Sequence, residues 1–156
     1  MHNPSDPIAQ MSELLAMLFA VTGDTIIENC GDVEGEKIIK KAVFRFGYER
    51  GRAIRETVLS EGQQITFENF ERYHDIPEND GWICNSHHDE NRLWEYTEYC
   101  PMAKKWQSMN LGHIGKYYCE VDYAIMAGYF GQVEFTRPKL FDSNDEGHCE
   151  MIVEII

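Results

Sequence analysis

The spacing of apolar residues changes once along the 156-residue chain, near residue 81. Before that point apolar residues recur every three to four positions, which predicts helices. We expect helices over residues 8–27, with a break at Gly23, over 33–59, and from the cap Thr66 through Tyr73. After it, alternating patterns predict strands over 82–85, 93–99, 133–137 and 149–155, with helices over 101–106 and 114–129 between them. This order favours an α+β fold, in which N-terminal helices pack on a mostly antiparallel four-stranded sheet with further helices between the strands.

The chain has neither an internal repeat nor a linker long enough to divide it. Hydrophobic residues make up 43% of it, which is an ordinary globular composition for this length. We therefore expect a single domain over residues 1–156, with residues 1–7 as a frayed lead.

The charge excludes several classes of partner. Lys and Arg number 14 against 27 Asp and Glu, a net charge of -13, and such a field repels phosphate backbones and anionic lipids. We expect no nucleic-acid partner and no membrane partner. The N-terminus lacks a signal-peptide pattern and the five cysteines form no CxxC pair, so a cytoplasmic protein with reduced thiols is expected. A homodimer fits the base rate for small domains.

Arg50 is the first residue whose position in the sequence suggests a chemical role. In helical projection it lies roughly 20° from Ile39, in the middle of the apolar stripe of its helix. A buried guanidinium must be paired, either with an internal carboxylate or with the carboxylate of a ligand. Gly47 and Gly51 flank it and permit close approach of another backbone or a ligand. Arg137 is a weaker second candidate, because it lies at a strand end before a proline, where exposure is easy.

The positions of three cysteines suggest a second functional feature. Cys100 precedes Pro101 at a helix N-cap, where backbone amides and the helix dipole favour a thiolate. Strand alternation places it on the face of Trp94, Tyr96 and Glu98. Cys149 opens the last strand on the core side with Met151, Val153 and Ile155. Cys119 lies three residues before Asp122 on one flank of a helix, so all three thiols and one carboxylate can face the interior.

Two chemistries fit such a group. One is a nucleophilic cysteine, Cys100 for preference, assisted by Asp122 or His113. The other is a zinc or similar soft-metal site held by Cys100, Cys119 and Cys149, with one open position for water. The spacing favours the first, because it contains no short ligand pair. We expect His87-His88 to lie in an exposed turn and the DSNDEGH run to be a solvated loop.

Four segments resemble the L-2-amino-thiazoline-4-carboxylic acid hydrolase family. They are FGYERG, CPMAKKW, YYCEVDYAIMAGYF and VEFTRPKLFDSNDEGHCEM, within residues 46–151. The resemblance implies hydrolytic ring opening of a small cyclic amidine that carries a carboxylate, by cysteine or metal-bound water. Mapped onto the matching positions, Arg50 and Arg137 would bind the substrate, and Cys100, Cys119, Asp122 and Cys149 would supply the chemistry. A more distant similarity is to small-molecule-binding domains of vinyl-reductase type.

Two other readings stay open from the residues. One is a non-catalytic module that binds a small ligand or a metal, as a sensor or accessory protein would. The other is a structural domain in which the cysteines fill the core and Arg50 pairs internally.

Overall fold

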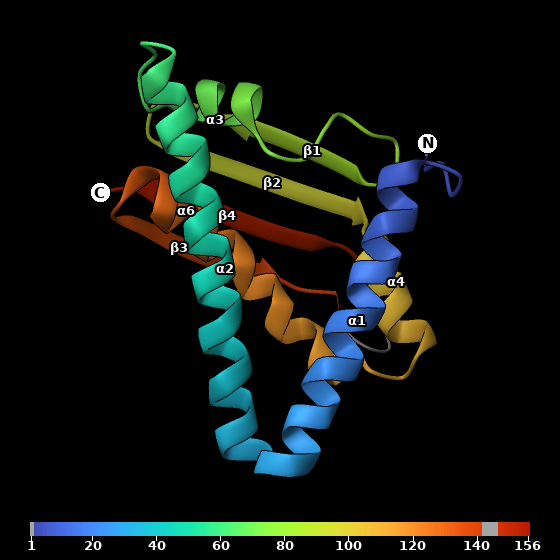
Figure 1. The fold of residues 1–156 in the computed structure, drawn as a ribbon. Helices are drawn as coiled ribbons and strands as arrows, with labels where there is room; N and C mark the ends of the chain where they lie inside the picture. Colours follow the sequence, from blue (N-terminus) through green and yellow to red (C-terminus); the bar gives the residue numbers. More distant parts are fainter. Residues whose placement is uncertain (1, 142–146) are drawn as a thin grey trace.

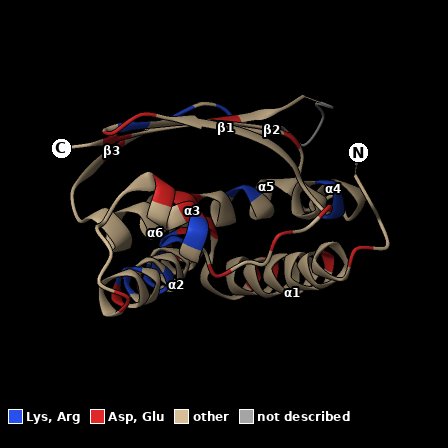
Figure 2. Cartoon of the chain, turned by 90° about the horizontal axis from the view of Figure 1, so that it is seen from above, with Lys and Arg blue, Asp and Glu red and all other residues tan. Residues whose placement is uncertain are grey.

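The computed structural model describes residues 2–141 and 147–156. Helices cover one face of a twisted four-stranded sheet, and the other face is open (Figures 1 and 2). The chain thus has the α+β architecture that its sequence predicts. In chain order the elements are α1 (Pro7–Cys30), α2 (Asp32–Ser60), α3 (Phe67–Tyr73), β1 (Ile83–His88), β2 (Arg92–Tyr99), α4 (Pro101–Ser108), α5 (Gly112–Gly115), the 3₁₀ helix η1 (Lys116–Glu120), α6 (Val121–Phe130), β3 (Val133–Lys139) and β4 (Cys149–Ile155).

The sheet has the strand order β1-β2-β4-β3, and every neighbouring pair is antiparallel. The last strand of the chain therefore lies inside the sheet and brings Cys149 opposite Thr97 of β2. Alternation along β2 buries Leu93 and Thr97 on the side of the helices. That face of β2 and β4 forms one wall of the interior.

Helix α6 packs against α2 at very short range, which glycines make possible. A Cβ atom on Gly51 would lie 2.0 Å from the carbonyl oxygen of Ile125, and one on Gly128 would lie 2.3 Å from that of Tyr48. The predicted close approach at Gly51 is thus an approach of backbone, not of ligand. It holds α6, and with it Asp122, between α2 and the sheet (Figure 1).

The short elements follow their local signals. The hydroxyl of Thr66 caps α3 by accepting a hydrogen bond from the amide of Asn69 at 3.1 Å. Pro101 occupies the first turn of α4, as predicted. Within α4, the indole of Trp106 donates a hydrogen bond of 2.8 Å to the carbonyl oxygen of Ala16, which links α4 to α1.

Several expected boundaries are wrong. Helix α1 continues through Gly23, because the glycine is buried against Ile114 where a side chain would not fit. The single helix expected over 114–129 is divided into α5, η1 and α6. His87 and His88 belong to β1, not to a turn, since the turn begins at Asp89.

Residues 2–6 of the expected lead contact the rest of the chain. The ring of His2 stacks on Tyr99 with centroids 3.8 Å apart, and Asn3 donates its amide to the carbonyl oxygen of Asp80 at 2.8 Å. The side chain of Asp6 caps α1 through the amides of Ile8 and Ala9. These bonds join the N-terminus to the segment that leads into β1.

Helix α1 is long and apolar enough, by length and composition, to cross a membrane. Buried helices and signal sequences have the same property, so this observation alone is weak. In the structure the fully buried residues of α1 are small, among them Ala9, Ala16 and Ala20.

Candidate functional site

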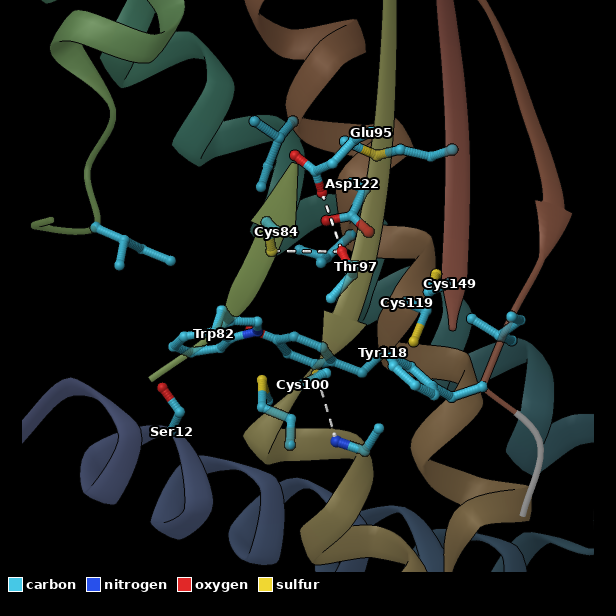
Figure 3. A pocket seen from close by; sticks show the side chains of 18 of the residues that line it. Ser12, Trp82, Cys84, Glu95, Thr97, Cys100, Tyr118, Cys119, Asp122 and Cys149 are labelled. Atoms are coloured by element: carbon cyan, nitrogen blue, oxygen red, sulfur yellow. Dashed lines mark hydrogen bonds between the residues drawn. The ribbon is translucent and has the colours of Figure 1, made fainter. Parts of the chain in front are cut away.

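A cavity of about 560 Å³ lies between the sheet and the helices. Four of the five cysteines line it, Cys84, Cys100, Cys119 and Cys149, whereas Cys30 is exposed at the end of α1. Figure 3 shows Cys119 and Cys149 near each other, with Cys100 farther along the cavity towards α1 and α4. The same wall includes Arg50, Asp122 and Arg137. The structure thus brings together the two arginines, three cysteines and one aspartate that the sequence nominates, from α2, β3, β4 and the segment Cys100–Asp122.

Arg137 connects the polar groups at one end of this cavity. Its side chain is 16% exposed, so it points inward and not into solvent as its strand-end position suggests. One terminal nitrogen, Nη2, donates to the carboxylate of Asp122 at 2.6 Å and to the carbonyl oxygen of Cys119 at 3.0 Å. The other, Nη1, lies 2.8 Å from the sulfur of Cys149. One guanidinium therefore connects a carboxylate and a thiol.

This arrangement sets the electrostatics of Cys149. Burial raises the pKa of its thiol, and the guanidinium of Arg137 opposes that rise by contacting the sulfur. Burial would lower the pKa of Arg137, but Asp122 and the neighbouring thiols outweigh it and raise the pKa. The cation lies in contact with the sulfur and offsets part of the effect of burial, although the pKa of Cys149 stays above its usual value.

Cys100 has the predicted N-cap position but a different electrostatic balance. Its sulfur accepts the amide of Ala103 at 3.4 Å at the start of α4. Burial nevertheless raises the pKa of Cys100 to about 11, although the amides of Ala103 and Met102 act in the opposite direction. The expected thiolate is therefore not favoured at this position, because desolvation costs more than the helix end returns.

The expected face of Cys100 is also wrong. It lines the cavity together with Glu95 and Thr97, not on the face of Trp94, Tyr96 and Glu98. The strand ends at Tyr99, so the chain turns into α4 before the alternation reaches Cys100.

Cys119 lies in η1, and burial followed by the charge of Asp122 raises its pKa well above the usual value. Thiols are soft ligands of the kind that zinc takes. Within residues 2–141 and 147–156, however, no three His, Cys, Asp or Glu side chains lie close enough to hold one ion. The thiols of Cys100, Cys119 and Cys149 as placed do not fit a shared metal.

Glu95 is the functional candidate that sequence reasoning missed. It extends from β2 into the cavity near Asp122 (Figure 3) and accepts the hydroxyl of Thr97 at 3.5 Å. Thr97 in turn lies 3.4 Å from the sulfur of Cys84. Burial, with a smaller contribution from Asp122, raises the pKa of Glu95 to about 7. The alternation of β2 could have found it, because it places Glu95 on the face of Leu93.

Arg50 lines the cavity but is already paired. Its Nε and Nη2 atoms donate to the two carboxylate oxygens of Asp75, each at 2.7 Å. This bidentate pair raises the pKa of Arg50 against the effect of burial and lowers that of Asp75. Of the two alternatives for Arg50, the structure shows the internal carboxylate.

The other nominated groups lie elsewhere. His113 is exposed and does not line the cavity, so it is not placed to assist a thiol there. The side chain of His88 lies 3.6 Å from Glu71. Most of the DSNDEGH run falls outside the described residues; His148 at its end pairs with Glu150 at 2.6 Å.

The end of the cavity nearest α1 and α4 is mostly apolar, with Ser12 of α1 also in its wall (Figure 3). It is lined by Leu15, Trp82, Met102, Ala103 and Trp106. Tyr118 lies in the cavity wall, and burial raises its pKa to about 12, so it stays a neutral hydroxyl. The cavity therefore has a charged end against α6 and the sheet and an apolar end against α1 and α4 (Figure 3).

Comparisons with known proteins identify the family and a related fold. The family described as L-2-amino-thiazoline-4-carboxylic acid hydrolase matches residues 11–152, nearly the whole chain. No curated protein sequence matches the chain. A solved structure with a similar fold is trafficking protein particle complex subunit 3 from Naegleria fowleri, described as covalently bound to palmitic acid. It is 18% identical, the match covers 93% of this chain and 95% of that one, and the TM-score is 0.52, which shows a shared fold.

Proposed function

The chain belongs to the L-2-amino-thiazoline-4-carboxylic acid hydrolase family, and from this premise we propose that it opens a small cyclic amidine bearing a carboxylate by hydrolysis. One observation carries the proposal: Arg137 contacts the sulfur of Cys149 and the carboxylate of Asp122 in the wall of one cavity. A thiol beside a fixed cation and an adjacent proton acceptor are the parts of an activated cysteine nucleophile.

Cys149 is the nucleophile in this proposal. Its sulfur contacts a guanidinium, whereas that of Cys100 accepts a long hydrogen bond of 3.4 Å from the backbone amide of Ala103. Arg137 holds the thiolate and orients Asp122. Because Glu95 titrates near neutral pH on the same wall, it is matched to donate and accept protons during turnover.

The proposed reaction passes through a covalent intermediate on Cys149. The thiolate of Cys149 adds to the amidine carbon, and a ring carbon–nitrogen bond breaks as that nitrogen takes a proton from Glu95. Water then adds to the same carbon and gives its proton to the carboxylate of Glu95. The carbon–sulfur bond breaks, the ring-opened product leaves, and the thiolate is restored beside Arg137. The net change is addition of one water across the ring bond.

The substrate carboxylate needs a cation. Arg50 lines the cavity, and its Nη1 amino group takes no part in the two bonds to Asp75. In the proposal this group binds the carboxylate, so that the amidine carbon faces Cys149. The apolar wall excludes water from the ring until it opens.

Turnover of 2-amino-thiazoline-4-carboxylate by the purified chain, followed by chromatography of the ring-opened product, tests the proposal. Cys149→Ser is expected to lower turnover by roughly three orders of magnitude. Cys30→Ser, at a thiol remote from the cavity, serves as the matched control and should retain full activity. An active Cys149→Ser together with an inactive Cys100→Ser would move the nucleophile to Cys100. Absence of turnover by the wild-type chain on this substrate and on related cyclic amidines would reject the function.

A second candidate is a non-catalytic module that retains an apolar ligand. Two observations favour it: the apolar end of the cavity, and thiols whose pKa values burial raises. The related fold whose description includes covalently bound palmitic acid points the same way. Denaturing extraction of the purified chain, with intact mass measured before and after hydroxylamine, tests it. A released fatty acid or a hydroxylamine-sensitive mass increase, without amidine turnover, would favour this candidate over the hydrolase.

A further inference from the structure

The outer face of α1 carries large apolar side chains in solvent. Met11, Leu14, Leu18 and Val21 are 63%, 54%, 65% and 50% exposed. The fully buried residues of the same helix are alanines and a glycine, while its larger inward side chains, Phe19, Ile26 and Ile27, are only partly buried against the core. Bulky apolar residues thus lie on both sides of α1, whereas they usually face only the core.

Packing explains why the inner face must be small. The carbonyl oxygen of Ala16 receives the indole of Trp106, and Gly23 has no space for a side chain beside Ile114. Close contact with α4 and α5 therefore selects small residues inside. It gives no reason for the large residues outside, which need an explanation of their own.

The outer residues follow the spacing of a helix–helix seam. Positions 11, 14, 18 and 21 are separated by three, four and three residues, and the series continues at Thr25. Alternation of three and four is the pattern by which two helices pack side chains into each other's grooves. In Figure 2, α1 lies at the edge of the helical layer. Nothing in the described residues covers this face.

The charges of α1 favour a protein over a lipid surface as the occupant. Helices that bind membrane surfaces carry Lys and Arg on their polar face. Helix α1 has neither; its charged residues are Glu13, Asp24 and Glu28. With a net charge of -13, the chain is also repelled by anionic lipids.

The exposed area matches what a dimer needs. Taking roughly 200 Å² for a large apolar residue when fully exposed, the six outward side chains of α1 offer about 600 Å² on each copy. They are Met11, Leu14, Leu15, Met17, Leu18 and Val21. Two copies would bury about 1,200 Å², the lower end of stable interfaces.

We infer that α1 is the interface of a homodimer, in which two copies of α1 pack antiparallel about a two-fold axis near Leu18. A two-fold axis makes the seam its own partner and closes the assembly. The antiparallel direction follows from the ends of the seam. A parallel pair would set Glu28 opposite Glu28 of the other copy, whereas the antiparallel pair sets it opposite Ile8. Leu15 also lines the cavity, so the second copy would lie beside the cavity wall.

Sedimentation velocity over a concentration series up to the high micromolar range tests this inference. The wild-type chain is expected to sediment as a dimer, and Leu18→Glu as a monomer with unchanged circular dichroism. Val33→Glu is the matched control, because Val33 is 86% exposed at the start of α2 and outside the seam, and it should remain dimeric.

An engineered disulfide tests the geometry of the proposed interface. In a Cys30→Ser background, Leu18→Cys should cross-link two copies on mild oxidation, since the same residue meets itself at a two-fold axis. A monomeric wild-type chain, or a dimer that Leu18→Glu leaves intact, would overturn the inference. So would a monomer that binds phosphatidylcholine vesicles through α1, which would assign the face to a membrane. These outcomes are independent of amidine turnover, so the interface and the proposed function fail separately.

Discussion

The two ends of the cavity hold the same reactive group in opposite settings. At the charged end, the sulfur of Cys149 contacts Arg137, which is itself fixed by Asp122. At the apolar end, Cys100 caps α4, and burial raises its pKa to about 11. The helix N-terminus, which is the stronger local signal in sequence, is the weaker influence in the folded chain. In a closed cavity a full charge in contact with the sulfur opposes the effect of burial more strongly than a short helix does, although the pKa of Cys149 also stays above its usual value.

Substitution of Glu95 is expected to give the largest change in stability at the charged end. Its pKa is raised from 4.5 to about 7, so its contribution to stability is fully present below pH 4.5 and is lost as pH rises through 7. At about 1.36 kcal/mol per pKa unit, the loss amounts to roughly 3 kcal/mol. Glu95→Gln, which has no charge to bury, should therefore gain roughly that much relative to the wild-type chain between pH 4.5 and pH 7.5. Urea unfolding at several pH values measures it.

Glu98→Gln is the control for that experiment, because Glu98 lies on the same strand with its side chain exposed. Its unfolding free energy should follow the wild-type pH dependence. Equal pH slopes for Glu95→Gln and the wild-type chain would mean that Glu95 is hydrated, and the charged end would then extend no farther than Asp122.

The second-largest expected change in stability comes from breaking the ion pair between Arg137 and Asp122. Arg137→Gln leaves the carboxylate without its cation, which for fully buried pairs costs about 3–5 kcal/mol. Asp122 keeps 39% of its side-chain surface, so solvent screening lowers the expected loss of unfolding free energy to about 2 kcal/mol. Alkylation of Cys149 should slow at the same time, since its thiolate loses the adjacent cation. Peptide mapping after a timed reaction with iodoacetamide reads this out.

A double variant separates the loss of stability from the loss of Cys149 reactivity. Arg137→Gln with Asp122→Asn removes both charges and should recover part of the lost stability without restoring the reactivity of Cys149. Arg92→Gln, at an exposed pair with Glu154, should cost less than about 1 kcal/mol. A comparable loss in both arginine variants would place Arg137 in the same class as a surface residue.

Most of the fold follows from local sequence signals. Thr66 and Pro101 mark helix starts by hydrogen-bonding and backbone rules that act over a few residues, and both helices begin there. The alternation that places Cys149 with Met151 on the inner face depends only on the pleat of one strand. Such features need no knowledge of the partner elements.

The missed features depend on partners distant in sequence. The sequence predicts an exposed Arg137 because it places the strand end at residue 137. In the structure β3 continues to Lys139, and the position of α6 supplies Asp122 as the partner of Arg137. Glu95 was overlooked because a charged residue on a strand usually marks the solvent side. For α1 the apolar stripe predicts the helix correctly but not which side faces the core, since close packing on α4 selects alanines there.

The apolar end should respond least, and in stability alone. Trp106→Phe removes the indole donor to Ala16 but keeps most of the ring that packs in the core. The carbonyl oxygen of Ala16 still has its helical partner, so the expected loss is that of one net hydrogen bond, about 1 kcal/mol. Turnover and the alkylation rate of Cys149 should stay at wild-type values, because the change lies at the other end of the cavity. If Trp106→Phe instead lowered turnover as strongly as Cys149→Ser, the two ends would act as one site. The nucleophile would then have to be sought near Cys100, where the helix N-cap first suggested it.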